Sequence, residues 1–105
     1  MATIQLWRGT KRGDEYETVE FVEFDGEEFG RIREATDVVE KTTVVYRAND
    51  GRIAIHEIRT RDKETHARVY FFTSVAAAWP NFGWELEAVG LRPRGAIFHT
   101  FEGYD

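Results

Sequence analysis

Residues 42–72, TTVVYRANDGRIAIHEIRTRDKETHARVYFF, carry the pattern that decides the fold. Asp50-Gly51 separates two segments rich in β-branched residues, and this dipeptide is typical of a two-residue type I′ hairpin turn. The polar run Arg61–Glu64 predicts a second hairpin further along the chain. We therefore predict three antiparallel strands that follow one another in the sequence.

The loop lengths set which residues lie opposite each other. A two-residue Asp50-Gly51 loop would place Ala48 opposite Ile53, Tyr46 opposite Ile55 and Val45 opposite His56. An Asp62-Lys63 loop would place Ile55 opposite Tyr70, Ile53 opposite Phe72 and Glu57 opposite Arg68. Opposed residues share a face of a sheet. One face should then hold Val45, Ala54, His56, Ala67, Val69 and Phe71. The other should hold Tyr46, Ile53, Ile55, Tyr70 and Phe72 at one end and Glu57, Arg59, His66 and Arg68 at the other.

Shorter alternating segments precede this region, and residues 2–8 and 16–24 predict two further strands. Asp25-Gly26 carries conflicting signals. Asp25 with Glu28 forms a capping box that would start a helix, whereas Asp-Gly between alternating segments predicts a hairpin. We choose the hairpin for residues 25–40, because the helix would have to contain Gly30 and several β-branched residues.

The C-terminal third predicts one helix and two strands. Ser74 can cap a short helix over residues 74–80, which Pro80 would end. Residues 84–89 and 96–102 alternate as strands do. The prediction is a single domain over residues 1–105 of α+β class, mostly antiparallel β. It would form one strongly bent or partly closed sheet of seven or eight strands, with a meander over residues 16–72 and one short helix near 74–80.

The composition excludes several kinds of chemistry. The chain has no cysteine, so disulfides, thiolate metal sites and thiol nucleophiles are absent, which favours the cytoplasm. No apolar run reaches the roughly twenty residues that a membrane span requires, and MATIQLWRGT does not have the pattern of a secretory signal. We therefore expect no contact with a membrane.

Catalytic and metal-binding patterns are also missing. The histidines His56, His66 and His99 lack ligand spacing, and the predicted register directs the first two to opposite faces. The single serine, Ser74, has no nucleophile motif around it, and no glycine-rich nucleotide motif occurs. We assign no catalytic residue, no metal and no cofactor, and expect a protein that is not an enzyme.

The negative charge of the chain is concentrated in one segment. The net charge is −5, yet residues 1–13 carry +3 and residues 14–28 carry eight acids and no base. Such a local charge creates a directional field. The hypothesis is an acidic β-hairpin that binds a protein partner with a basic surface. Its predicted binding residues are Glu17, Glu20, Glu23, Asp25, Glu27, Glu28, Tyr46 and Tyr70. The alternative is that these charges only keep a sheet edge from pairing with other chains.

A small inhibitor or adaptor, such as a phage or mobile-element protein that blocks a nucleic-acid-handling complex, fits this size and charge. The predicted edge strands would also permit a homodimer. Direct binding of nucleic acid has one point in its favour, because Tyr46, Tyr70 and Phe72 would lie on one face beside Arg59 and Arg68. The sequence pI of about 5.2 argues against it.

A second hypothesis is a half-barrel that binds or transforms a small ligand. Its pocket would be lined by His56, Tyr46, Tyr70 and Trp84. Burial between apolar neighbours would keep His56 neutral near pH 7. The two hypotheses differ in their expected response, since partner binding through carboxylates should weaken with salt and pocket chemistry should follow the titration of His56.

One short segment resembles a known family. The pattern Val44-Val45-Tyr46-Arg47 followed by residues 51–56, GRIAIH, is similar to the middle of the EXLDI proteins, a family of unknown activity. The C-terminal signature of that family is absent, because this chain ends FEGYD. The resemblance implies no particular chemistry.

Overall fold

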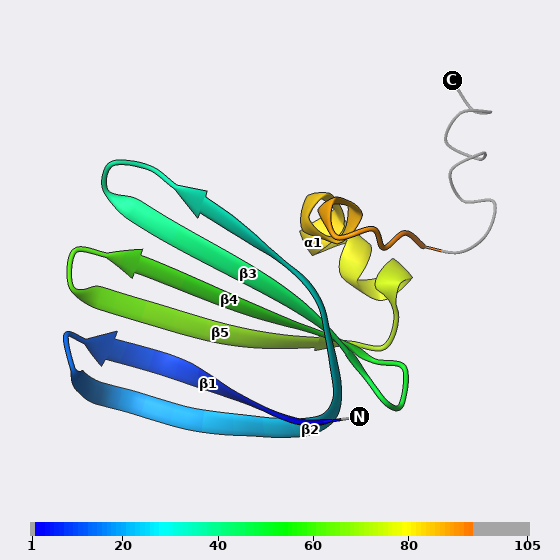
Figure 1. Ribbon diagram of the computed structural model, residues 1–105, viewed down its shortest axis with the longest axis horizontal. Helices are drawn as coiled ribbons and strands as arrows, with labels where there is room; N and C mark the ends of the chain where they lie inside the picture. Colours follow the sequence, from blue (N-terminus) through cyan, green and yellow to red (C-terminus); the bar gives the residue numbers. More distant parts are fainter. Residues whose placement is uncertain (1, 94–105) are drawn as a thin grey trace.

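The computed structural model describes residues 2–93. Five antiparallel strands close into a barrel in chain order, and one helix follows them (Figure 1). Their bounds are β1 Ala2–Arg12, β2 Glu15–Ala35, β3 Val39–Ala48, β4 Ile53–Arg61, β5 Glu64–Phe72 and α1 Val75–Ala88. The predicted class, mostly antiparallel β with one short helix, is confirmed. The prediction of seven or eight strands in a bent sheet is wrong, and its last strand, 96–102, lies outside the described residues.

The strand count falls because β2 continues through Asp25-Gly26, where neither the predicted hairpin nor the alternative helix forms. Gly26 pairs with Ala2 of β1 and with Ala48 of β3, so it lies where β2 passes from one partner to the other. A Cβ at Gly26 would lie only 2.3 Å from the carbonyl oxygen of Arg47. The glycine therefore serves the close approach of two backbones and not a turn.

The hairpin between β3 and β4 forms where it was predicted, but its loop is one residue longer. Gly51 has a φ of 91°, and the Ala48 N–H donates to the carbonyl of Arg52 at 2.9 Å. This is a three-residue loop with glycine in the left-handed region, not the two-residue type I′ turn. The predicted pairing of β3 with β4 is therefore wrong by one position, and the faces of β3 are exchanged.

The observed pairs are Val45 with Ile55, Tyr46 with Ala54 and Val44 with His56. The second predicted hairpin is confirmed together with its register. Asp62 and Lys63 form its loop, Asp62 has a positive φ of 58°, and Glu57 lies opposite Arg68 as expected. A positive φ at the first of two loop residues is the feature of a type II′ hairpin turn.

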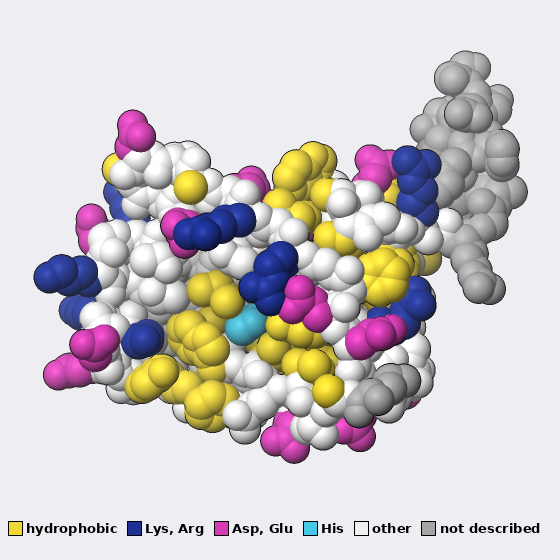
Figure 2. Space-filling view, in the orientation of Figure 1, with side chains coloured by type: hydrophobic (Ala, Val, Ile, Leu, Met, Phe, Trp, Pro, Cys, Tyr) yellow, Lys and Arg dark blue, Asp and Glu magenta, His cyan; other side chains and the backbone are white. Residues whose placement is uncertain are grey.

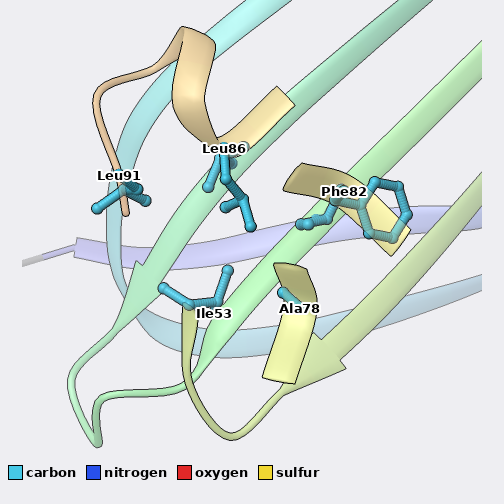
Figure 3. Close-up of a cluster of buried hydrophobic side chains, with 7 residues drawn as sticks. Ile53, Ala78, Phe82, Leu86 and Leu91 are labelled. Carbon is cyan, nitrogen blue, oxygen red and sulfur yellow. The ribbon is translucent and has the colours of Figure 1, made fainter. Parts of the chain in front are cut away.

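The two faces of the sheet pack into two hydrophobic clusters. The inner cluster fills the barrel, and its buried members are Leu6, Phe24, Val44, Tyr46, Ala48 and Ala54. The outer cluster lies between the sheet and α1 (Figure 3). Its buried members are Val45, Ile53, Ile55, Ala78, Phe82, Leu86 and Leu91. The chain thus forms a barrel with one helix on the outside of β3, β4 and β5.

The helix begins as predicted and ends later. The Ser74 hydroxyl accepts a hydrogen bond from the Ala77 N–H at 3.1 Å, which caps the first turn. Pro80 does not end the helix, which continues past it with a kink at Phe82, where φ is −132°. The strand predicted over 84–89 is wrong. Ala78, Phe82 and Leu86 recur every four residues and are buried, as one face of a helix requires.

Candidate functional site

Half of the predicted acidic binding residues are engaged inside the molecule. Glu17 lies 3.4 Å from Arg12, Glu20 lies 3.2 Å from Arg8, and Glu28 lies 2.6 Å from Arg31. The hydrogen bond from Arg31 lowers the pKa of the Glu28 carboxyl. These pairs are exposed and contribute little to stability. Each arginine nevertheless compensates part of the charge of its carboxylate, which weakens the attraction for a basic partner.

The other three acids lie together on the outward face of β2. Glu23, Asp25 and Glu27 are exposed, whereas Phe24 and Gly26 between them are buried. Within residues 2–93, no basic group lies within ion-pair distance of these three carboxylates. Asp25 accepts a hydrogen bond from the Thr3 hydroxyl at 2.9 Å, which fixes its orientation. Because alternate residues of a strand repeat about every 7 Å, the carboxylates form a regular row.

One exposed phenylalanine lies at each end of this row. The side chain of Phe21 is 61% exposed and that of Phe29 is 38% exposed. The guanidinium of Arg47 lies over the Phe29 ring, 5.0 Å from its centroid. We call Phe21, Glu23, Asp25, Glu27 and Phe29 the acidic strip. The predicted binding residues include its three acids but neither phenylalanine. Phe21 shares the alternation of the acids, whereas Phe29 lies at a β-bulge between Glu28 and Gly30 that no sequence pattern indicated.

The two predicted tyrosines do not join the acidic strip. Tyr46 is 8% exposed inside the barrel, where its ring meets Phe24 edge to face and burial raises the pKa of its hydroxyl. Tyr70 lies on the outer face of β5, and its ring centroid is 5.2 Å from that of Phe82 on α1. The structure therefore separates Tyr70 from the predicted acids, and it places Tyr46 opposite Glu28, which is paired with Arg31.

His56 is held inside the barrel, with only 5% of its surface exposed. Its Nε2–H donates to the backbone carbonyl of Trp7 at 2.7 Å. The pairing of β1 with β5 ends at Gly9, and Trp7 lies beyond that end. His56 therefore donates a hydrogen bond to a carbonyl of β1 that does not pair with β5. Burial lowers the pKa of His56, although the bond to Trp7 opposes the shift.

The residues of the predicted His56 pocket are not brought together. His56 and Tyr46 lie inside the barrel, Tyr70 lies between the sheet and α1, and Trp84 is 61% exposed on α1. The ring nitrogen of His56 that faces Trp7 is already engaged. A general base needs access to the proton that it removes. His56 is buried and its Nε2–H is bonded to Trp7, so its position does not support a role as a general base.

A second polar region lies on the outer face of the sheet, beyond the end of α1. Its side chains form two rows across β3, β4 and β5, which are Lys41, Arg59 and His66, then Thr43, Glu57 and Arg68. We call these six residues the open end. Figure 2 shows charged side chains of both signs at the left-hand end of the molecule, where the β1–β2, β2–β3 and β4–β5 turns lie.

The open end is tied to the helix by half-buried charges. Lys41 Nζ lies 3.5 Å from Glu57 Oε2 and 3.9 Å from Glu85 Oε2 of α1. A hollow of about 310 Å³ is lined by Glu57, Arg59, His66 and Arg68. Sequence reasoning placed these four residues on one face. Lys41 and Thr43 are absent from that prediction because the predicted β3 register is shifted by one residue, and Glu85 is absent because the prediction for residues 84–89 is a strand.

Comparison with known proteins adds nothing to these observations. No protein-family model, curated protein or solved structure matches the chain. The similarity of residues 44–56 to the EXLDI family gains no support from the family models. Within residues 2–93, no three side chains of metal-ligand type are grouped to hold an ion, and no helix has the length and apolar character to cross a bilayer. The function is therefore argued from geometry.

Proposed function

We propose that this protein is a non-enzymatic interaction protein that binds a basic protein surface through the acidic strip. One observation carries the proposal. Three carboxylates without an ion-pair partner among residues 2–93 lie in a row on one outward face, between two exposed phenylalanine rings. The other predicted acids with arginine partners, Glu17, Glu20 and Glu28, have no part in it.

The chemistry of the acidic strip suits a protein interface. Aromatic side chains are enriched at the centres of such interfaces and supply most of the binding energy. Complementary charge accelerates encounter and disfavours partners of the wrong sign. The strip offers both, since Phe21 and Phe29 provide apolar area and Glu23, Asp25 and Glu27 provide the field.

The partner is a different protein with an arginine- or lysine-rich surface. An isologous dimer centred on the strip would bring identical carboxylates together, which is unfavourable. A groove that otherwise holds nucleic acid has the required charge, so a small inhibitor or adaptor of a nucleic-acid-handling complex is the class that we favour. The absence of cysteine supports a cytoplasmic setting.

The test compares two triple variants with the same change of charge. The first, Glu23→Gln/Asp25→Asn/Glu27→Gln, neutralises the strip, and the second, Glu17→Gln/Glu20→Gln/Glu28→Gln, neutralises acids that are already paired. Each is used as bait with extracts of the source cells at low salt, about 0.05 M, and high salt, about 0.5 M, which changes screening severalfold. Bound proteins are identified by mass spectrometry, and each direct interaction is confirmed with purified proteins.

The expected result is a basic protein that binds the parent chain at low salt and is released at high salt. It should be lost from the strip variant and retained by the paired-acid variant. Capture that is insensitive to salt, equal loss from both variants, or no direct partner would each contradict the proposal. Circular dichroism of both variants checks that the fold is unchanged.

A further inference from the structure

The open end has a geometry that the proposed function does not use. We propose that it binds a phosphate group carried by a small molecule, with Arg59 and Arg68 as the two binding residues. The inference concerns the outer face of β4 and β5 and does not depend on the acidic strip of β2.

Sheet register brings the two arginines to one hollow. Arg59 lies opposite His66, and Arg68 lies opposite Glu57, so the arginines are diagonal neighbours on adjacent strands. Diagonal positions are about 7–8 Å apart, and side chains as long as arginine can converge on one group across that distance. Both line the same hollow of about 310 Å³. That volume lies at the lower end of the range for small-molecule sites.

Among residues 2–93, neither arginine has a carboxylate within ion-pair distance, although Glu57 acts electrostatically on Arg68 from the opposite position. Within residues 2–93, most arginines form an ion pair, namely Arg8, Arg12, Arg31, Arg33, Arg52 and Arg92. Arg59 forms none there, and the guanidinium of Arg68 has the Tyr70 hydroxyl as its hydrogen-bond partner. The donors of two guanidiniums are therefore available on one side of the sheet.

The acid in the hollow is partly balanced. Glu57 is paired with Lys41, and their side chains are only 17% and 22% exposed. Lys41 also lies 3.9 Å from Glu85, so Lys41, Arg59 and Arg68 together exceed these two carboxylates by one positive charge. A phosphate monoester has three acceptor oxygens and close to two negative charges at neutral pH, which suits two guanidinium groups at once, whereas a carboxylate has two oxygens and one charge. Guanidinium groups also bind phosphate oxygens in bidentate geometry.

The surroundings favour a small phosphorylated molecule over a nucleic acid. The hollow is confined to four residues of β4 and β5, and the net charge of the chain is −5. A polyanion would meet repulsion over most of the surface, while a single phosphate group would lie only against the residues of the hollow. The platform is also rigid, because both arginines lie inside paired strands and Lys41 ties the neighbouring strand to Glu85 of α1.

The test is a titration of the full chain followed by NMR, with inorganic phosphate, phenyl phosphate, acetate and a single-stranded oligonucleotide as probes. The variants are Arg59→Gln and Arg68→Gln. Arg61→Gln is the matched control, because Arg61 also lies on β4, two residues beyond Arg59, but does not line the hollow.

We expect saturable binding of phenyl phosphate, with shifts centred on Glu57, Arg59, His66 and Arg68. Each hollow variant should weaken binding about tenfold, as the loss of a charge-assisted contact predicts, and Arg61→Gln should change it less than about twofold. Neutralising the acidic strip should leave this binding intact, which separates the two proposals. Equal weakening by Arg61→Gln, acetate binding as tight as phosphate, or no saturable phosphate binding would overturn the inference. Tighter binding of the oligonucleotide would replace it with a nucleic-acid surface.

Discussion

The outer face of β3, β4 and β5 has two ends that differ in almost every respect. At the covered end, Val45, Ile53, Ile55, Tyr70 and Phe72 lie beneath α1. At the open end, the same three strands carry Lys41, Thr43, Glu57, Arg59, His66 and Arg68. The side chains change from apolar to charged between one row and the next. A short helix thus divides a continuous sheet face into a structural half and a half that is available for binding.

The boundary between the two ends is itself stabilised by pairing. Glu85 of α1 lies near Lys41, which is also paired with Glu57. Charged groups therefore lie along the edge of the outer hydrophobic cluster. On the reverse side of the sheet, His56 is buried in the inner layer that supports both ends. Stability therefore depends on the covered end and the inner layer, while the exposed arginines of the open end, Arg59 and Arg68, can change at little cost.

The largest expected effect is at the covered end. Leu86→Ala removes a fully buried side chain of α1 and leaves a cavity against the sheet. We expect a loss of about 3 kcal/mol in the free energy of unfolding, measured by urea denaturation. Trp84→Ala, two residues away and largely exposed, is the control and should cost far less. Similar losses from the two variants would contradict the docking of α1 through Leu86.

A smaller effect, dependent on pH, is expected from the inner layer. The pKa of His56 is lowered in the folded state, so the unfolded chain binds the proton more readily. The stability due to neutral His56 is complete above its ordinary pKa of 6.5 and decreases as the pH falls from there toward the folded pKa. Urea denaturation between about pH 8 and pH 5 should show a steeper decrease for the parent chain than for His56→Gln.

The matched control for that measurement is the exposed histidine, since His66→Gln should retain the steep decrease. A His56→Gln variant with the same pH dependence as the parent would show that the imidazole of His56 does not resist protonation in the folded chain.

At Thr43, the open-end residue that borders the covered end on β3, we expect a gain in stability. The hydroxyl of Thr43 is fully buried and has no hydrogen-bond partner among residues 2–93. Thr43→Val keeps the shape and removes the unsatisfied group, so thermal denaturation should show stabilisation of about 1 kcal/mol. Thr60→Val is the control, because it removes a hydroxyl that is bonded to Thr65 at 3.0 Å, and it should not stabilise. A loss of stability in Thr43→Val would mean that a partner such as water satisfies that hydroxyl.

The smallest effect on stability is expected at the two exposed arginines of the open end. Arg59→Gln and Arg68→Gln should change the free energy of unfolding by less than about 0.5 kcal/mol, because both side chains are exposed and no carboxylate of residues 2–93 lies within ion-pair distance of them. The measurement is the same denaturation series. A large loss in either variant would show that the open end is structural, and it would remove the distinction between the two ends.

The sequence predicted the parts of the fold that depend on local chemistry. Asp62-Lys63 gave the correct β4–β5 register, and Ser74 gave the correct start of α1. Asp50-Gly51 marked a real turn, but the participation of Asn49 in the loop was not evident, and the error exchanged the faces of β3. At Asp25-Gly26 the prediction was wrong, because Gly26 is required by the close approach of the β3 backbone and not by a turn. No local sequence signal indicates such an approach.

The candidate sites divide in the same way. The alternation of Glu23, Asp25 and Glu27 could be read directly from the sequence, since alternate residues of a strand share a face. The sequence could not indicate which acids form ion pairs, because Glu17 and Glu20 meet arginines of β1 that only the strand pairing brings near. The grouping of Lys41 with Glu85 required both the true register of β3 and the helical state of residues 84–89.

The acidic strip exists only if β2 is extended through Asp25-Gly26, and proton–proton contacts in the NMR spectrum of the full chain test this most directly. The structure predicts cross-strand contacts from Gly26 to both Ala2 and Ala48, together with a regular strand pattern from Glu23 to Glu27. Contacts between Phe24 and Glu27 across a turn at Asp25-Gly26, without contacts from Gly26 to Ala48, would contradict the continuous strand and remove the proposed binding surface.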